Sequence, residues 1–121
     1  MYIHSLSPDG LADQAIARDS IIEDTTNDLY HRLVRDEQAV VVRTIAGRRT
    51  PVVTTVSADL AEDAADHIQP EQIAALLIAV AKHRIDRSNV ALVTAAAEAI
   101  VAEIIAARAE YTADREMQVT A

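Results

Sequence analysis

Residues 39–56, AVVVRTIAGRRTPVVTTV, carry the strongest strand signal in the chain. Two runs rich in β-branched residues, 39–45 and 51–56, flank the connection 46–50, in which Gly47 suits a turn. The pattern predicts a β-hairpin over about residues 39–57. Both runs are apolar on both faces, so we expect helices or a second copy of the chain to cover each side. An isolated two-stranded ribbon is only marginally stable.

Helical spacing of apolar residues predicts helices on either side of this hairpin. The first helical region covers residues 7–36, with Ser7 as its expected N-cap and Tyr2–Leu6 before it as a short strand or arm. Its polar stretch 24–27, DTTN, favours a bend or a break into two helices. After the hairpin, three helices are expected over residues 58–68, 70–85 and 88–118, with Ser57 and Ser88 as caps.

The helix over residues 70–85 is apolar nearly all the way round, through 73–81, IAALLIAVA. A helix that is hydrophobic on all sides is typical of a buried position, so we expect other elements to enclose it. It begins at Pro70, which fits a first helical turn. It ends in a basic stretch, Lys82, His83, Arg84 and Arg87, which suits the negative end of a helix dipole.

The last helix has a seam of apolar residues spaced alternately by three and four. Such spacing over three heptads is typical of a coiled-coil surface, and it predicts self-association through this helix. A thirty-residue helix is about 45 Å long, more than the diameter of a globule of this size, so we expect part of it to project or to pack on another chain. The seam consists of Val90, Val93, Ala97, Ile100, Ile104, Ala107 and Tyr111.

Composition fits one domain, residues 1–121, of predominantly helical α+β class: a helical bundle with one hairpin and a long C-terminal helix. The chain has 121 residues, two glycines, no cysteine and a net charge of −8. The absence of cysteine excludes disulfides and thiolate chemistry. The acidic balance argues against nucleic acid as the main partner and favours a basic protein partner. No membrane-spanning segment or secretory signal is expected, which makes the cytoplasm the expected location.

Catalytic signatures are missing from the sequence, and we expect no enzyme, cofactor or resident metal. Two glycines cannot build a phosphate-binding loop or a dinucleotide fingerprint. The cluster Glu62, Asp63 and Asp66 resembles the acidic helix motif of the all-α nucleotide pyrophosphohydrolases, but the second acidic pair that those enzymes need is missing. Asp63 and His67 lie four residues apart, as two metal ligands on one helix face would, although ion pairing explains them equally well.

Two groups of charged residues are candidates for partner binding. Arg48 and Arg49 occupy the expected hairpin connection, where guanidinium groups can contact phosphate or a partner's carboxylate. Four acidic side chains of the last helix lie off the seam and can form a surface for a basic partner. They are Glu98, Glu103, Glu110 and Asp114.

The segment Gln38–Leu60, QAVVVRTIAGRRTPVVTTVSADL, resembles the hairpin of Phd/YefM-type antitoxins, in which a basic turn joins two apolar strands before a helix start. The resemblance implies an N-terminal part that dimerises on operator DNA and a C-terminal part that wraps a toxin. The Ala-rich helices expected in the C-terminal half differ from the polar tail of that family.

The leading hypothesis is therefore a non-enzymatic acidic interaction or assembly protein that forms a homo-oligomer, a dimer or larger, and binds a macromolecular partner. Small helical chains of this composition are common among phage- and plasmid-borne proteins, which include assembly components and inhibitors. Two alternatives stay open: a DNA-binding regulator acting through the hairpin, and a metal-dependent nucleotide hydrolase using the acidic cluster.

Overall fold

The computed structural model describes residues 8–120, and the expected Tyr2–Leu6 arm and Ser7 cap lie outside this range. The order of elements is α1 (Pro8–Arg35), β1 (Val40–Ile45), β2 (Arg48–Val53), α2 (Ala58–Asp63), the 3₁₀ turn η2 (Ala65–His67), α3 (Pro70–Ile85), the 3₁₀ turn η3 (Arg87–Asn89) and α4 (Val90–Thr120). This confirms the predicted class: a predominantly helical α+β fold with one hairpin and a long C-terminal helix.

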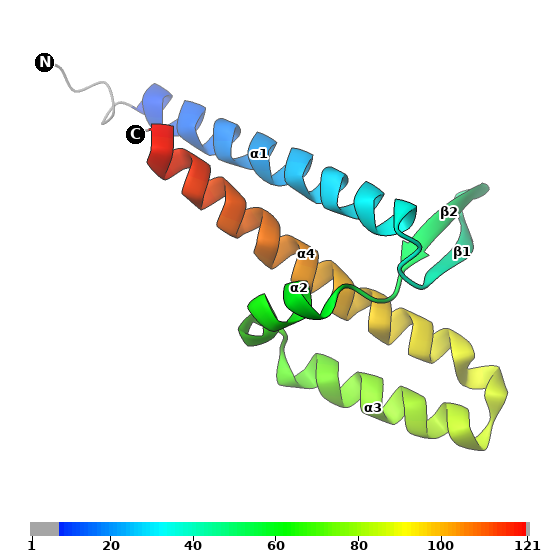
Figure 1. Ribbon diagram of the computed structural model, residues 1–121. Coiled ribbons are helices and arrows are strands. Elements are labelled where there is room, and N and C mark those ends of the chain that lie inside the picture. Colours follow the sequence, from blue (N-terminus) through cyan, green and yellow to red (C-terminus); the bar gives the residue numbers. More distant parts are fainter. Residues whose placement is uncertain (1–7, 121) are drawn as a thin grey trace, which may run out of the picture.

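Helix α4 is the longest helix, and α1, α2 and α3 all pack against it (Figure 1). Helix α1 runs antiparallel to it along its C-terminal part, and α3 packs antiparallel against its N-terminal part from the other side. The expected projection of the last helix is therefore not found in the fold, because two helices of the same chain cover different stretches of its length. The short helix α2 and η2 lie against the middle of α4.

The first helix is continuous from Pro8 to Arg35, so the expected break into two helices at residues 24–27 is wrong. Thr25 and Thr26 are half-buried, and α1 packs along α4. Tertiary packing of a helix face outweighs the weak helix propensity of two threonines, which amounts to a few tenths of a kcal/mol each.

The hairpin turn is shorter than the sequence suggests. Ala46 and Gly47 alone form it, with φ angles of 52° and 77°, which corresponds to the tight turn whose twist matches that of paired strands. Arg48 and Arg49 therefore lie in β2, opposite Ile45 and Thr44, and not in a five-residue connection.

One predicted cap is confirmed, and one cap and one helix boundary differ from the prediction. The Ser57 hydroxyl accepts a hydrogen bond from the Leu60 N–H at 3.3 Å and caps α2 as predicted. The expected helix 58–68 is divided, because α2 ends at Asp63 and η2 follows. Asp86, not Ser88, caps the start of the last helical region, since its carboxylate accepts from the Ser88 N–H at 3.0 Å.

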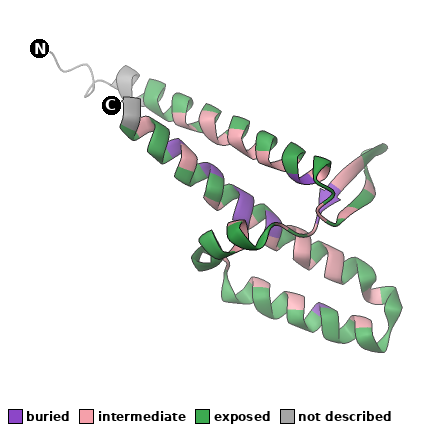
Figure 2. Ribbon diagram, viewed as in Figure 1, coloured by how far each residue is buried: buried purple, intermediate pink, exposed green. Residues whose placement is uncertain are grey.

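The main core lies where α1, the base of the hairpin and α4 meet. Leu33, Val53, Val101 and Ile105 form its buried centre, and Tyr30 is among the half-buried residues around it. Figure 2 shows buried positions along the middle and C-terminal part of α4, whereas α3 is mostly exposed. The expectation that α3 is enclosed is therefore wrong for a single chain: α4 covers one face, and Ala79 is the buried residue of the helix.

Candidate functional site

The predicted seam of α4 is used mainly inside the chain. Ile104 is buried, Val93, Ala97, Ile100 and Ala107 are half-buried, and Val90 and Tyr111 at its two ends are exposed. Helices α3 and α2 of the same chain pack against α4. The middle of the seam is therefore covered, at least in part, by helices of the same chain, whereas Val90 and Tyr111 at its ends are exposed.

Among the described residues, α3 has more large apolar side chains exposed than any other helix. Its inner positions, spaced by three and four residues, turn toward α4, which leaves the remaining apolar side chains without cover. At the start of α4, Val90 and Leu92 are also exposed. We call the exposed side chains of α3 the outer α3 face: Ile73 (48% exposed), Leu77 (65%), Ile78 (56%), Val80 (40%) and Ile85 (90%).

The outer α3 face has charge of opposite sign at its two ends. Glu71 lies in the first turn of α3, and Lys82 and Arg84 lie in its last turn. Residues 73–81 between them are all apolar, and the alanines among them allow close approach of another helix. The sequence indicates that α3 is apolar around its whole circumference. It does not indicate which side of α3 packs against α4 and which side stays exposed.

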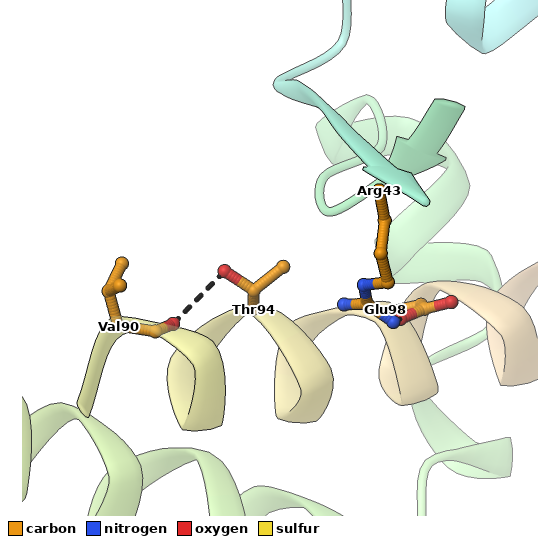
Figure 3. Close-up of polar contacts among 4 residues, drawn as sticks. All are labelled: Arg43, Val90, Thr94 and Glu98. Carbon is orange, nitrogen blue, oxygen red and sulfur yellow. Dashed lines mark hydrogen bonds and ion pairs between the residues drawn. The ribbon is translucent and has the colours of Figure 1, made fainter. Parts of the chain in front are cut away.

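The hairpin is anchored to α4 by one ion pair. Arg43 of β1 extends toward α4, where its guanidinium donates to the Glu98 carboxylate at 2.8 Å (Figure 3). Thr94, one turn before Glu98, bonds back to the Val90 carbonyl at 3.0 Å and stays within its own helix. The pKa of the Tyr30 hydroxyl is raised, mainly because the side chain is partly buried and secondly because of the negative charge of Glu98.

The acidic side chains predicted to bind a partner fall into two groups. Glu98 is held by Arg43, and Asp114 forms an ion pair with Arg18 at 2.9 Å, which raises the pKa of that guanidinium. Glu110 is exposed and Glu103 is half-buried. The carboxylates available to a partner are therefore mainly Glu110 and Glu103, while the other two hold elements of the chain together.

Arg48 and Arg49 are exposed at the far end of the hairpin from the core. Neither forms an ion pair within residues 8–120. The structure thus places both guanidinium groups near the turn end of the hairpin, exposed to solvent.

A groove between α2, η2 and α4 brings together several side chains that the sequence analysis treated separately. Its cavity of about 300 Å³ is lined by Asp63, His67, Arg108 and Tyr111, among others. The Arg108 guanidinium lies 3.7 Å from the Asp63 carboxylate and 5.7 Å from the centre of the Tyr111 ring. The Arg108–Tyr111 contact lies within α4, and the Arg108–Asp63 ion pair joins α4 to α2. Both side chains of that ion pair are largely exposed, so it contributes little to stability. No cluster of three His, Asp or Glu side chains placed to hold a metal ion is found among the described residues.

Helix α4 with η3, residues 87–118, is long and apolar enough by length and composition to cross a membrane. Only 17% of its apolar window is buried, although α1 and α3 both pack against α4, and a single helix of this kind is weak evidence for a membrane span. Comparisons with protein-family models, with curated proteins and with solved structures found no match for this chain.

Proposed function

We propose that the chain is a non-enzymatic interaction or assembly protein that self-associates through the outer α3 face and binds a macromolecular partner. The single observation that supports it most is the set of five large apolar side chains left exposed on α3. Monomeric proteins rarely expose a contiguous apolar patch of this kind, and such patches mark interaction sites.

Charge favours an antiparallel arrangement of two α3 helices around a two-fold axis. In that arrangement Glu71 of one chain approaches Lys82 of the other, twice, while Leu77 lies near the axis. A parallel arrangement would place like charges together at both ends. The self-complementary pattern of an acidic start and a basic end makes a second copy the best fit for this face.

The net charge of −8 supports a basic protein as the further partner, located in the cytoplasm. Electrostatic attraction speeds association with such a partner and makes it sensitive to salt. Self-association through α3 is mainly apolar and should persist in high salt. Comparing low and high salt therefore separates the two kinds of contact.

The experiment is light scattering coupled to size exclusion on the parent chain, the Leu77→Asp variant and the Ile16→Asp variant. Ile16 on α1 is 67% exposed and Leu77 is 65% exposed, so the two substitutions change surface chemistry equally. We expect the parent and the Ile16 variant to have at least twice the monomer mass of 13.1 kDa, and the Leu77 variant to lose mass. A parent chain with the monomer mass at micromolar concentration would refute the proposal.

A DNA-binding regulator is the second candidate, because Arg48 and Arg49 protrude together without a partner in the described part of the chain. The test is an electrophoretic shift with double-stranded DNA. Loss of the shift in an Arg48→Ala/Arg49→Ala double variant would support it, and a shift that survives the double substitution would remove these residues from consideration.

A further inference from the structure

The hydrogen-bond register of the hairpin shows which main-chain groups of β1 point outward. Ile45 pairs with Arg48 across the two-residue turn, and the Thr54 N–H donates to the Ala39 carbonyl at 3.2 Å at the other end. Bonded pairs alternate with non-bonded pairs in an antiparallel ladder. Residues 39, 41, 43 and 45 therefore bond to β2, and the N–H and C=O groups of Val40, Val42 and Thr44 point away from it.

The two edges of the hairpin differ in how they are protected. On β2 the outward positions include Pro51, opposite Val42, which has no N–H to offer another strand. β1 contains no proline or lysine that would block its outer edge. Three of its apolar side chains, Val41, Val42 and Ile45, are 40–51% exposed. Proteins normally block an exposed apolar edge of this kind, because it is a template for pairing with another strand.

Among the described residues no strand other than β2 pairs with β1, and the Val40 side chain at its base packs against the core. Strand β2 contacts α1 and α4, whereas β1 lies on the side of the hairpin away from α1 (Figure 1). The sheet contains these two strands and no third one in residues 8–120. The Arg43–Glu98 ion pair joins β1 to α4 through a side chain (Figure 3).

We propose that β1 pairs antiparallel with β1 of a second copy of the chain, centred on Val42, to form a four-stranded sheet. The inference deepens the proposed self-association and uses a surface separate from the outer α3 face. Packing of β2 on α1 and α4 already supports the hairpin on one side. Pairing through β1 would add main-chain hydrogen bonds for the groups of Val40, Val42 and Thr44 that point away from β2.

The sequence of β1 fits one register of this pairing best. With Val42 opposite the partner's Val42, Val40 lies opposite the partner's Thr44, and the three outward residues of each strand make six main-chain hydrogen bonds. Arg43 then lies opposite the partner's Val41. A shift that centres the pairing on Arg43 would place two guanidinium groups directly opposite each other, which is destabilising, and would lose hydrogen bonds.

Two separate self-complementary surfaces predict an assembly larger than a dimer. The outer α3 face joins two chains and the β1 edge joins each of them to another copy, so four chains are the smallest assembly in which both surfaces can be fully used. Disrupting one surface should leave a dimer held by the other, and disrupting both should leave the monomer.

The test is to measure molar mass for Val42→Lys, Val42→Glu and their equimolar mixture, with Ile16→Lys as the matched surface control. We expect each Val42 variant alone to have half the parent mass, because like charges meet at the axis. The mixture should recover the parent mass, since opposite charges then meet, and the control should not change. Combining Val42→Lys with Leu77→Asp should give the monomer.

Amide hydrogen exchange by NMR gives an independent readout. In the assembled parent, the amides of Val40, Val42 and Thr44 should exchange at least about tenfold more slowly than in the Val42→Lys variant, while the inward amides of β1 stay protected in both. If Leu77→Asp lowers the mass but Val42→Lys does not, and the outward amides exchange rapidly in the parent, edge pairing is wrong and the proposed function stands. A monomeric parent overturns both.

Discussion

Replacement of Ile104 by aspartate tests whether α4 is covered by helices of its own chain. Ile104 is 3% exposed at the middle of α4. Losing a buried isoleucine side chain costs about 1.5–3 kcal/mol of transfer free energy, and placing a carboxyl there without a partner costs several kcal/mol more. The sum, about 4–7 kcal/mol, is comparable with the total stability of about 6 kcal/mol expected for a 121-residue domain with a small core.

The matched control is Val90→Asp, which introduces the same side chain into the same predicted seam. Val90 is 54% exposed at the start of α4, where a negative charge suits the helix dipole. Urea denaturation followed by circular dichroism at pH 7 should show Val90→Asp within about 1 kcal/mol of the parent. We expect Ile104→Asp to be largely unfolded, and the milder Ile104→Ala, which should still fold, to lose about 2–4 kcal/mol.

The stability of Ile104→Asp should also depend on pH in a way that the loss of packing alone would not produce. Burial raises the pKa of the introduced carboxyl in the folded state above the unfolded value of about 3.9. The folded state therefore binds the proton more tightly, and the destabilisation is largest above the folded pKa and partly relieved as pH falls toward 4. Equal denaturation midpoints for the Ile104 and Val90 variants would refute the arrangement of α3 and α2 against α4.

Three further predictions follow from single contacts. The Tyr30 hydroxyl should titrate above its ordinary pKa of 10.0. The stability that it contributes is therefore present below pH 10 and is lost as pH rises through the higher folded pKa. Tyrosinate absorbance should show that Glu98→Gln moves the Tyr30 pKa only part of the way back, because burial is the larger cause of the shift. Gly47→Ala should cost about 1–2 kcal/mol in urea denaturation from backbone strain at φ 77°, since no atom lies within 4 Å of the added carbon, and an unchanged midpoint would contradict the turn geometry. The hydrogen bond from the Ser88 N–H lowers the pKa of Asp86 below 3.8. The stability contributed by the Asp86 cap should therefore be present above pH 3.8 and be lost as pH falls through the folded pKa. Asp86→Ala should remove this acid-dependent part of the melting temperature, and the same acid dependence in both proteins would contradict the cap.

Local patterns determined the secondary structure well. Alternation between β-branched runs and helical spacing located the hairpin and every helix to within a few residues, because those periodicities reflect side-chain geometry along a single element. Errors arose where tertiary contacts outweigh local preference. The threonines in α1 stay helical because α1 packs on α4. The turn consists of Ala46 and Gly47 alone because the pairing of the two strands continues as far as Ile45 and Arg48, the residues on either side of the turn.

Candidate surfaces were harder to foresee from the sequence. The three–four spacing in α4 has the same appearance whether a second chain or the chain's own helices cover it, and only the fold assigns Ile104 to the interior. The same holds for Glu98 and Asp114, whose partners Arg43 and Arg18 lie 55 and 96 residues away in the chain. Spacing along one helix carries no information about such distant neighbours.

The sequence by itself determined that this protein is acidic, cysteine-free, predominantly helical and built around one hairpin, since composition and periodicity are properties of the chain alone. The tertiary structure decided which apolar residues remain uncovered. Helix α3 is apolar on all sides, yet a neighbouring helix can cover only one of them, and β1 has two edges of which β2 pairs with one. The uncovered side of each is the surface from which we infer association, because burying apolar area and satisfying main-chain hydrogen bonds are what a second chain can still provide.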